Sequence, residues 1–167
     1  MSRTFLLAPM SLGIKGLTIL LLLLPLCFGL WALISHNQGA GMIFLLLMTL
    51  YGFIWFCCRP ACFVVSHDDL KLVFPVWQRR IPIRTISRVR LISKEMFCRE
   101  FGQAMRIGVG GLWGGFGWLW TSQRGLIEFY ISRADHLVCI DRSTGNSLLI
   151  TPDQANQFVE TLQRSLQ

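Results

Sequence analysis

The sequence has no charged side chain between Lys15 and Arg59. Only 15% of its 167 residues are charged, well below the quarter or so that is typical of soluble globular chains. A membrane component is therefore expected. A chain of this length has room for one ordinary domain and a small appendage, which excludes a large multidomain enzyme.

The uncharged stretch is long enough for two membrane-spanning helices, since a bilayer core needs about 20 apolar residues per helix. Leu17–Ser35 and Met42–Cys58 are apolar, and the polar, flexible His36–Gly41 separates them. We therefore predict a transmembrane helical hairpin over residues 17–58, kinked at Pro25. A cleaved signal peptide is the competing interpretation, but no small-x-small cleavage site follows the first span.

The positions of Lys and Arg predict the orientation of this hairpin. Arg3 and Lys15 precede the first span and Arg59 follows the second, whereas the connection between the spans has neither Lys nor Arg. Because cytoplasmic flanks carry the excess of positive residues, both termini are expected in the cytoplasm. Residues 1–16 are then an N-terminal cytoplasmic segment, and residues 59–167 form a cytoplasmic domain.

The pattern after Arg59 is that of a β-rich domain. Short runs of β-branched and apolar residues alternate with turn signals, which predicts about seven strands. In SRVRLIS the alternation places Val89 and Leu91 on a core face and Arg88 and Arg90 on a basic face.

The end of the chain changes to a helical period. Phe158, Val159 and Leu162 share one apolar stripe, and Thr151 followed by Pro152 is typical of a helix start. The predicted fold is an α-helical transmembrane hairpin followed by a mainly-β, pleckstrin-homology-like domain. That domain consists of about seven bent antiparallel strands plus one C-terminal helix.

The second half of the chain resembles the bacterial pleckstrin-homology (PH) domains. The resemblance covers about Ile81–Leu166 and rests on SRVRLI, RIGVGGLWGGFG, RGLIEFYISR, HLVCID and LLITPDQANQFVETL. It implies a binding module, commonly placed after transmembrane helices, here in the bacterial inner (plasma) membrane. It carries over no ligand, cofactor or catalytic residue. The insert Glu95–Arg106 and the tryptophan-rich Trp113–Trp120 depart from the family pattern.

Motifs of a catalytic or metal site are missing from the sequence. The three histidines lie apart without HExxH spacing, the carboxylates are dispersed, and no G-x-S-x-G occurs. The six cysteines predict no disulfide framework, because a cytoplasmic domain is kept reduced. The cluster CCRPAC, Cys57–Cys62, lacks the second ligand pair of a zinc site. We expect no enzyme, no cofactor and no metal.

The strongest charge signal is a run of basic residues without an acidic one. Its six members are Arg79, Arg80, Arg84, Arg88, Arg90 and Lys94. Two interpretations stay open: a solvated strand face, or attraction to anionic lipid headgroups, worth about 1 kcal/mol per basic residue near the surface. Nucleic acid is not an expected partner, since no nucleic-acid motif occurs and the domain is tethered to a membrane.

The stretch Arg106–Trp120, RIGVGGLWGGFGWLW, has six glycines and three tryptophans. It is no dinucleotide loop, because Trp113 stands where the last glycine is required, and no P-loop, because it has no Lys. A third span would split the sheet. The glycines permit strong bending of a strand. Of Trp113, Phe116, Trp118 and Trp120, we expect some rings in the core and some on a patch facing the membrane or a partner.

The sequence thus predicts a non-catalytic, membrane-anchored binding or scaffolding protein. One role is the sensing of a lipid surface or of envelope stress through the basic strand and the aromatic segment. The other is that of an accessory or assembly subunit in a larger membrane complex. The expected partners are anionic membrane lipids or a membrane protein, and salt separates the two because it screens charge contacts with lipid.

Overall fold

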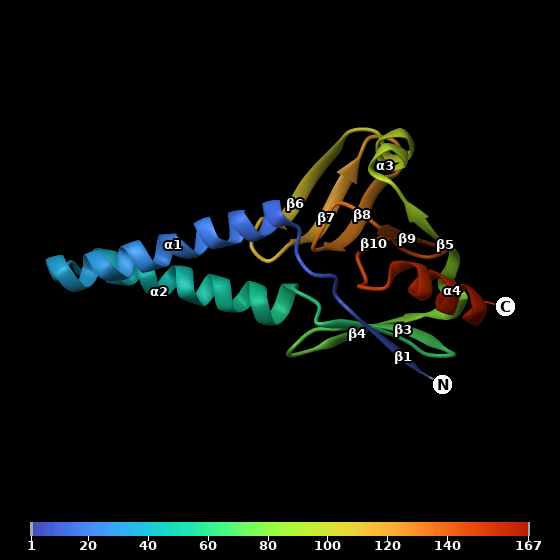
Figure 1. Cartoon of the computed structure of the whole chain (residues 1–167), viewed down its shortest axis with the longest axis horizontal. Helices are drawn as coiled ribbons and strands as arrows, with labels where there is room; N and C mark the ends of the chain where they lie inside the picture. Colours follow the sequence, from blue (N-terminus) through green and yellow to red (C-terminus); the bar gives the residue numbers. More distant parts are fainter. Residues whose placement is uncertain (1, 167) are drawn as a thin grey trace.

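The computed structural model describes residues 2–166, which form a helical hairpin and a β-rich domain (Figure 1). Helix α1 spans Leu12–Ser35, and α2 spans Gln38–Phe53 and continues into the π-helical turn Ile54–Cys58. Both helices are long and apolar enough to cross a membrane. Only 11% of the most apolar stretch of each is buried, so they are not the core helices of a soluble domain.

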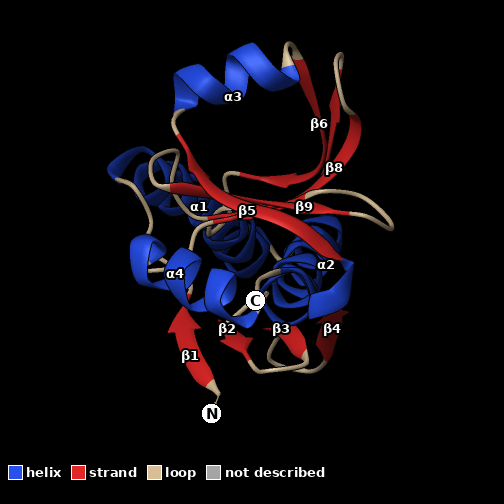
Figure 2. Ribbon diagram, turned by 90° about the vertical axis from the view of Figure 1, so that its right-hand side faces the viewer, coloured by secondary structure: helices blue, strands red, loops and turns tan. Residues whose placement is uncertain are grey.

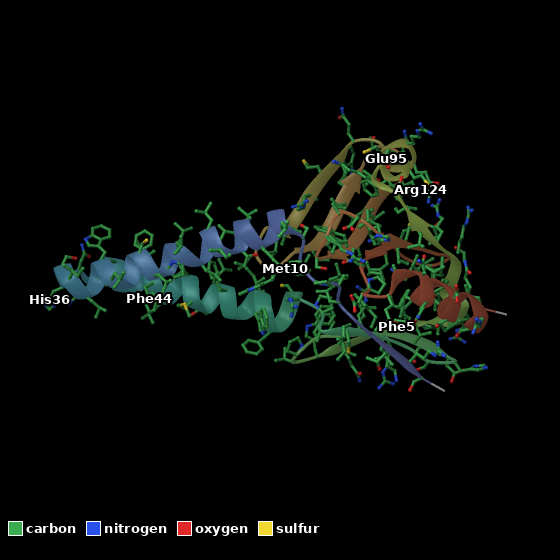
Figure 3. All side chains as sticks on the ribbon, in the orientation of Figure 1. Phe5, Met10, His36, Phe44, Glu95 and Arg124 are labelled. Carbon is green, nitrogen blue, oxygen red and sulfur yellow. The ribbon has the colours of Figure 1, made fainter. Side chains whose placement is uncertain are left out.

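Side-chain caps set the ends of the two helices. Ser11 accepts a hydrogen bond from the first turn of α1, so the helix begins at Leu12, before the predicted membrane span that starts at Leu17. His36 ends α1 in left-handed backbone with φ 49°, and Asn37 caps α2. His36 lies at the end of the hairpin far from the β-domain, and the two helices pack side by side (Figure 3).

The β-domain contains two sheets. The first has the order β1-β2-β3-β4 and is formed by Arg3–Leu6, Cys62–Val65, Asp69–Val73 and Gln78–Pro82. The second has the order β5-β9-β10-β8-β7-β6 and is formed by Ile86–Ile92, Leu137–Arg142, Leu148–Ile150, Gly125–Ile131, Gly115–Thr121 and Ala104–Gly110. Neighbouring strands are antiparallel except β10 and β8, which are parallel. The predicted fold class is confirmed, with strands beyond the expected seven at β1 and at the hairpin β6–β7.

Strand β1 makes the N-terminal segment a part of the domain. It pairs with β2, placing Phe5 opposite Phe63. The chain then bridges from Leu7 to Pro152. Phe5 is only 6% exposed, and its ring meets that of Phe158 edge-on with centroids 5.2 Å apart. A strand of four residues is too short for its alternation to stand out in the sequence.

Two apolar cores lie on opposite faces of the second sheet. The first lies between the two sheets and is closed by α4, Ala155–Ser165, whose Phe158 and Leu162 are fully buried. The second lies between the other face of this sheet and α3, Lys94–Phe101. Figure 2 shows α3 and α4 on opposite sides of β5 and β9.

The predicted apolar stripe of the last helix is confirmed, but its predicted cap is wrong. The helix begins at Ala155, three residues after Pro152. The buried hydroxyl of Thr151 instead accepts a hydrogen bond from Ser132 N–H at 2.9 Å, so it is not available to cap the helix.

We expect Phe5→Ala to lower the free energy of unfolding by about 3–5 kcal/mol, because it opens a cavity in the first core. The neighbouring Leu6 is 63% exposed and is the matched control, with a loss below about 1 kcal/mol for Leu6→Ala. Urea unfolding of the protein in lipid nanodiscs measures both. Equal losses would contradict the burial of β1 in the core.

Candidate functional site

The glycine-tryptophan stretch forms the hairpin β6–β7, whose tip packs against the base of the helical hairpin. Thr18 Oγ1 of α1 accepts from Trp113 N–H at 3.0 Å, and its one hydrogen is shared between the carbonyl oxygens of Ile14 at 2.8 Å and Gly111 at 2.9 Å. The Trp113 ring meets Trp55 and Tyr51 edge-on, with centroid distances of 4.8 and 6.4 Å. We call these contacts the tip joint. They connect the β-domain to both helices.

Glycine is required at the tip joint because the backbone approaches α1 closely. At Gly111, where φ is 97°, a Cβ would lie 2.5 Å from Leu17 Cδ2. Further along the hairpin, a Cβ at Gly117 would lie 2.6 Å from the Ile107 carbonyl oxygen of the neighbouring strand. These positions explain why a strand segment carries so many glycines.

The aromatic residues of this stretch divide between interior and surface. Phe116 is 2% exposed in the first core, and Trp113 is half-buried in the tip joint. In contrast, Trp118 and Trp120 are 48% and 49% exposed.

Cross-strand pairing extends the two exposed rings into an apolar surface. Ile107 lies opposite Trp118, and Met105 and Leu126 lie on either side of Trp120. Paired residues project from the same face of a sheet, and all of these side chains are exposed. We call this surface the aromatic face: Met105, Ile107, Trp118, Trp120 and Leu126. The glycines hide the alternation that would have indicated Met105 and Ile107 in the sequence.

The six basic residues do not form one surface. Arg79 points between the sheets and makes a bidentate pair with Glu128, with Nη2 3.0 Å from Oε1. Arg90 points toward α3 and pairs with Glu100 and, at 3.3 Å, with Asp141. The hydrogen bond that Arg90 donates to Glu100 raises the pKa of Arg90. These two arginines join structural elements.

Arg80 and Arg84 lie on the side of the domain remote from the helical hairpin. Both line a surface hollow that includes Leu166, near the C-terminus (Figure 1). By contrast Trp77, just before β4, donates its indole N–H to the Cys57 carbonyl at the base of the helices. Arg84 follows Trp77 along the chain by roughly 20 Å, at about 3.3 Å per residue. It is therefore farther than Trp77 from the base of the helices.

The remaining members, Arg88 on β5 and Lys94 at the start of α3, are exposed. Contact of the basic run with anionic lipid stays a prediction. Among residues 2–166 no group of three or more His, Cys, Asp and Glu side chains could hold a metal ion.

An ion network fixes α3 over the second sheet. In addition to the Arg90 pairs, Arg124 Nη1 lies 3.2 Å from Asp141 Oδ1, and Arg124 Nη2 lies 3.6 Å from Glu100 Oε2. The hydrogen bond from Arg90 lowers the pKa of Glu100 in the folded protein. The ionised form of Glu100 is therefore the one that holds α3.

The Glu100 carboxylate predicts a pH dependence of stability. Because its folded pKa is lowered, its contribution is present above the unfolded value of about 4.3 and is lost as pH falls through the folded value. Glu100→Gln should therefore lower the stability at pH 7 by about 1–2 kcal/mol and flatten the loss below pH 4. Urea unfolding of the variant and the wild type at pH 7 and pH 3 measures both effects.

The control for this experiment is Glu160→Gln. Glu160 is exposed and pairs with Arg164 at 3.8 Å on the surface of α4. We expect this substitution to change the free energy of unfolding by no more than about 0.5 kcal/mol at either pH. If Glu100→Gln and the wild type lost stability in parallel between pH 7 and 3, the assigned role of the ion network would be wrong.

The sequence model of the bacterial PH domain family matches residues 62–166. The match includes β2 to β10 and both helices of the β-domain, and the helical hairpin lies outside it. Searches of curated proteins and of solved structures find no match. Two sheets closed by a C-terminal helix agree with the fold that the resemblance implied. The chain therefore belongs to the bacterial PH domain family.

Proposed function

We propose that the protein is a non-catalytic, membrane-anchored scaffold that docks a membrane-protein partner on its aromatic face. The helices α1 and α2 are its anchor in a bacterial inner membrane, and the β-domain lies in the cytoplasm with both termini. Arg3, Lys15 and Arg59 at the domain end of the hairpin support this orientation, because cytoplasmic flanks are enriched in positive residues.

The main support for a protein partner is the distance of the aromatic face from the membrane. The strands β6 and β7 run obliquely away from the base of the helices (Figure 1). Trp118 and Trp120 follow Gly114 by four and six residues, which at about 3.3 Å per residue is roughly 13 and 20 Å of strand. A headgroup layer is only about 5–8 Å thick on each side of the bilayer core. These lengths are upper limits on the height, because the strands run obliquely, and they support a protein rather than lipid as the cover of these two rings.

The chemistry of the aromatic face favours an apolar surface on the partner. Glu128, the cross-strand neighbour of Trp118, is only 5% exposed and is paired with Arg79, so it adds no free charge. Tryptophan is enriched among the residues that dominate binding energy at protein interfaces. An exposed apolar patch of this kind marks an interaction site.

The open edge of β6 offers the same partner a second contact. It is an edge strand of the second sheet, and within residues 2–166 no strand pairs with its outer side. A row of free backbone N–H and C=O groups can bind an extended segment as an added strand. Met105 and Ile107 of the aromatic face belong to this strand, so one partner segment can contact both the edge and the face.

Purification of the intact protein in mild detergent tests the proposal. We expect one integral membrane protein to co-purify, with retention at about 0.5 M salt, where charge contacts are screened. The double substitution Trp118→Ser and Trp120→Ser should reduce the amount of co-purified partner at least tenfold. The reason is that truncation of an interface tryptophan typically lowers the binding free energy by about 2 kcal/mol or more. The thermal midpoint of this variant should stay close to that of the wild type, because both rings are half exposed.

A matched pair of charge substitutions separates protein docking from lipid sensing. Arg84→Glu with Arg88→Glu removes exposed basic residues and leaves the aromatic face intact. The proposal predicts unchanged co-purification in this variant. If the partner persisted without Trp118 and Trp120, or if the intact protein only bound anionic vesicles and released them at high salt, the docking proposal would be wrong.

A further inference from the structure

A pocket of about 430 Å³ lies between α3, β6 and the face of the second sheet opposite the aromatic face. Its walls are mostly apolar and include Phe97, Leu119, Ile131, Leu137 and Leu149. The volume falls within the range of roughly 300–1,000 Å³ that is usual for small-molecule sites. The ion network of Arg90 holds α3 in place as one wall of this pocket.

Among the described residues, the only charged side chains that line the pocket are Lys94 and Arg106. Both are exposed, and in the described part of the chain neither makes an ion pair. The Arg106 guanidinium lies over the Phe129 ring, 5.6 Å from its centroid, which limits its freedom. An apolar cavity with two unpaired cations complements a ligand that has an apolar body and one anionic end.

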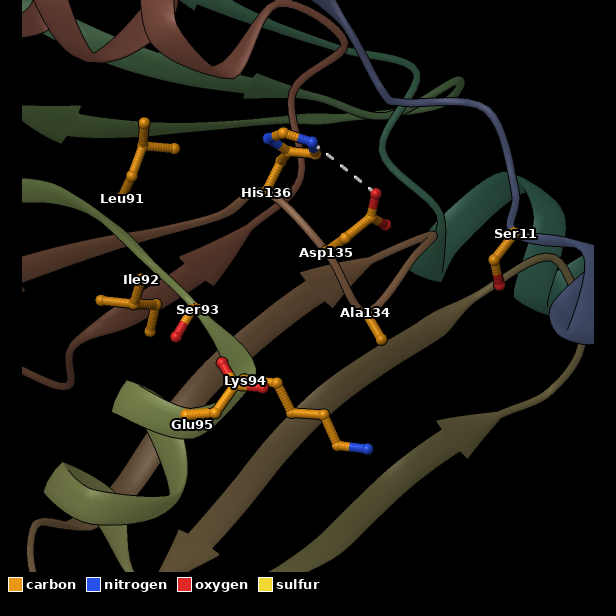
Figure 4. A pocket seen from close by; sticks show the side chains of 9 residues that line it. All are labelled: Ser11, Leu91, Ile92, Ser93, Lys94, Glu95, Ala134, Asp135 and His136. Atoms are coloured by element: carbon orange, nitrogen blue, oxygen red, sulfur yellow. Dashed lines mark ion pairs between the residues drawn. The ribbon is translucent and has the colours of Figure 1, made fainter.

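The cationic side of the pocket faces the end of the domain that meets the helices. A neighbouring hollow shares Lys94 and Ala134 with the pocket and extends to Ser11, the cap of α1 (Figure 4). The side chain of Arg106 runs beside Gly110, next to the tip joint. An amphiphile that leaves the bilayer at the base of the helices would therefore meet both cations on this side of the domain.

We propose that this pocket binds a long-chain carboxylate, with the alkyl chain beneath α3 and the carboxylate between Lys94 and Arg106. Charge-assisted hydrogen bonds of this kind are about twice as strong as neutral ones. The site requires the membrane anchor but not the partner. Leu119 lies between Trp118 and Trp120 on β7, so ligand and partner contact alternate residues of one strand.

Photo-labelling with palmitate that carries a diazirine on its chain tests the site. The full-length protein is placed in phosphatidylcholine nanodiscs, irradiated, and mapped by mass spectrometry. We expect the label within residues 94–106 and 131–137, and at least tenfold less label there from the matching uncharged alcohol. Label confined to α1 and α2, or equal labelling by acid and alcohol, overturns the proposal. This comparison uses the wild-type protein and needs no variant to fold.

Charge substitutions test the two cations. Lys94→Glu with Arg106→Glu should reduce the pocket label at least tenfold, whereas the Arg84→Glu and Arg88→Glu control, with the same change in net charge, should leave it unchanged. Circular dichroism verifies the fold of both variants. An equal loss of pocket label in the two variants would indicate a general effect of charge and would contradict the proposed site. Stronger competition by an alkyl phosphate than by unlabelled palmitate overturns the choice of carboxylate.

Discussion

The whole structure depends on the fact that the helical hairpin is attached to the β-domain at three places, besides the hydrogen bond from the Trp77 indole to the Cys57 carbonyl. β1 leads into α1, β2 follows the end of the second helix, and these two strands are hydrogen-bonded neighbours in one sheet. The tip joint adds the third attachment through Thr18, Gly111 and Trp113. A domain held in this way cannot swing on a linker, and its surfaces keep fixed positions relative to the helices.

At β7, the two faces of the second sheet present different surfaces. Trp118 and Trp120 project from one face, where they are open to a partner, and Leu119 projects from the other into the pocket beneath α3. The proposed occupancy of the pocket and the proposed docking on the aromatic face would therefore involve the same strand. The arginines that join the layers, Arg79 and Arg90, each pair with a carboxylate on another element.

Local patterns predicted the large elements of this fold. The uncharged stretch indicated the helical hairpin, alternation indicated β5, and the apolar stripe of Phe158 and Leu162 indicated α4. The family resemblance added the fold class. These predictions depend on residues close in sequence, which is why they could be made from one chain.

The joints between elements could not be predicted, because their partners are distant in sequence. Thr18 is a single polar residue in a leucine-rich run, and nothing nearby indicates that its hydroxyl binds Gly111 and Trp113. Likewise, the run of basic residues suggested one charged surface, but Arg79 and Arg90 face Glu128 and Glu100, which lie on other elements. Pairing with a distant carboxylate changes the role of an arginine without changing the local pattern.

A distance measurement between the two parts tests the central claim most directly. Spin labels at Ile34, near the outer end of α1, and at Thr144, in the turn between β9 and β10, replace side chains that are both exposed. Pulsed electron paramagnetic resonance in nanodiscs, on a cysteine-free background, should give one narrow distance distribution. Thr18→Val should broaden it. A broad or multimodal distribution in the protein with Thr18 intact would contradict the account, because it would show that the β-domain moves freely relative to the helices.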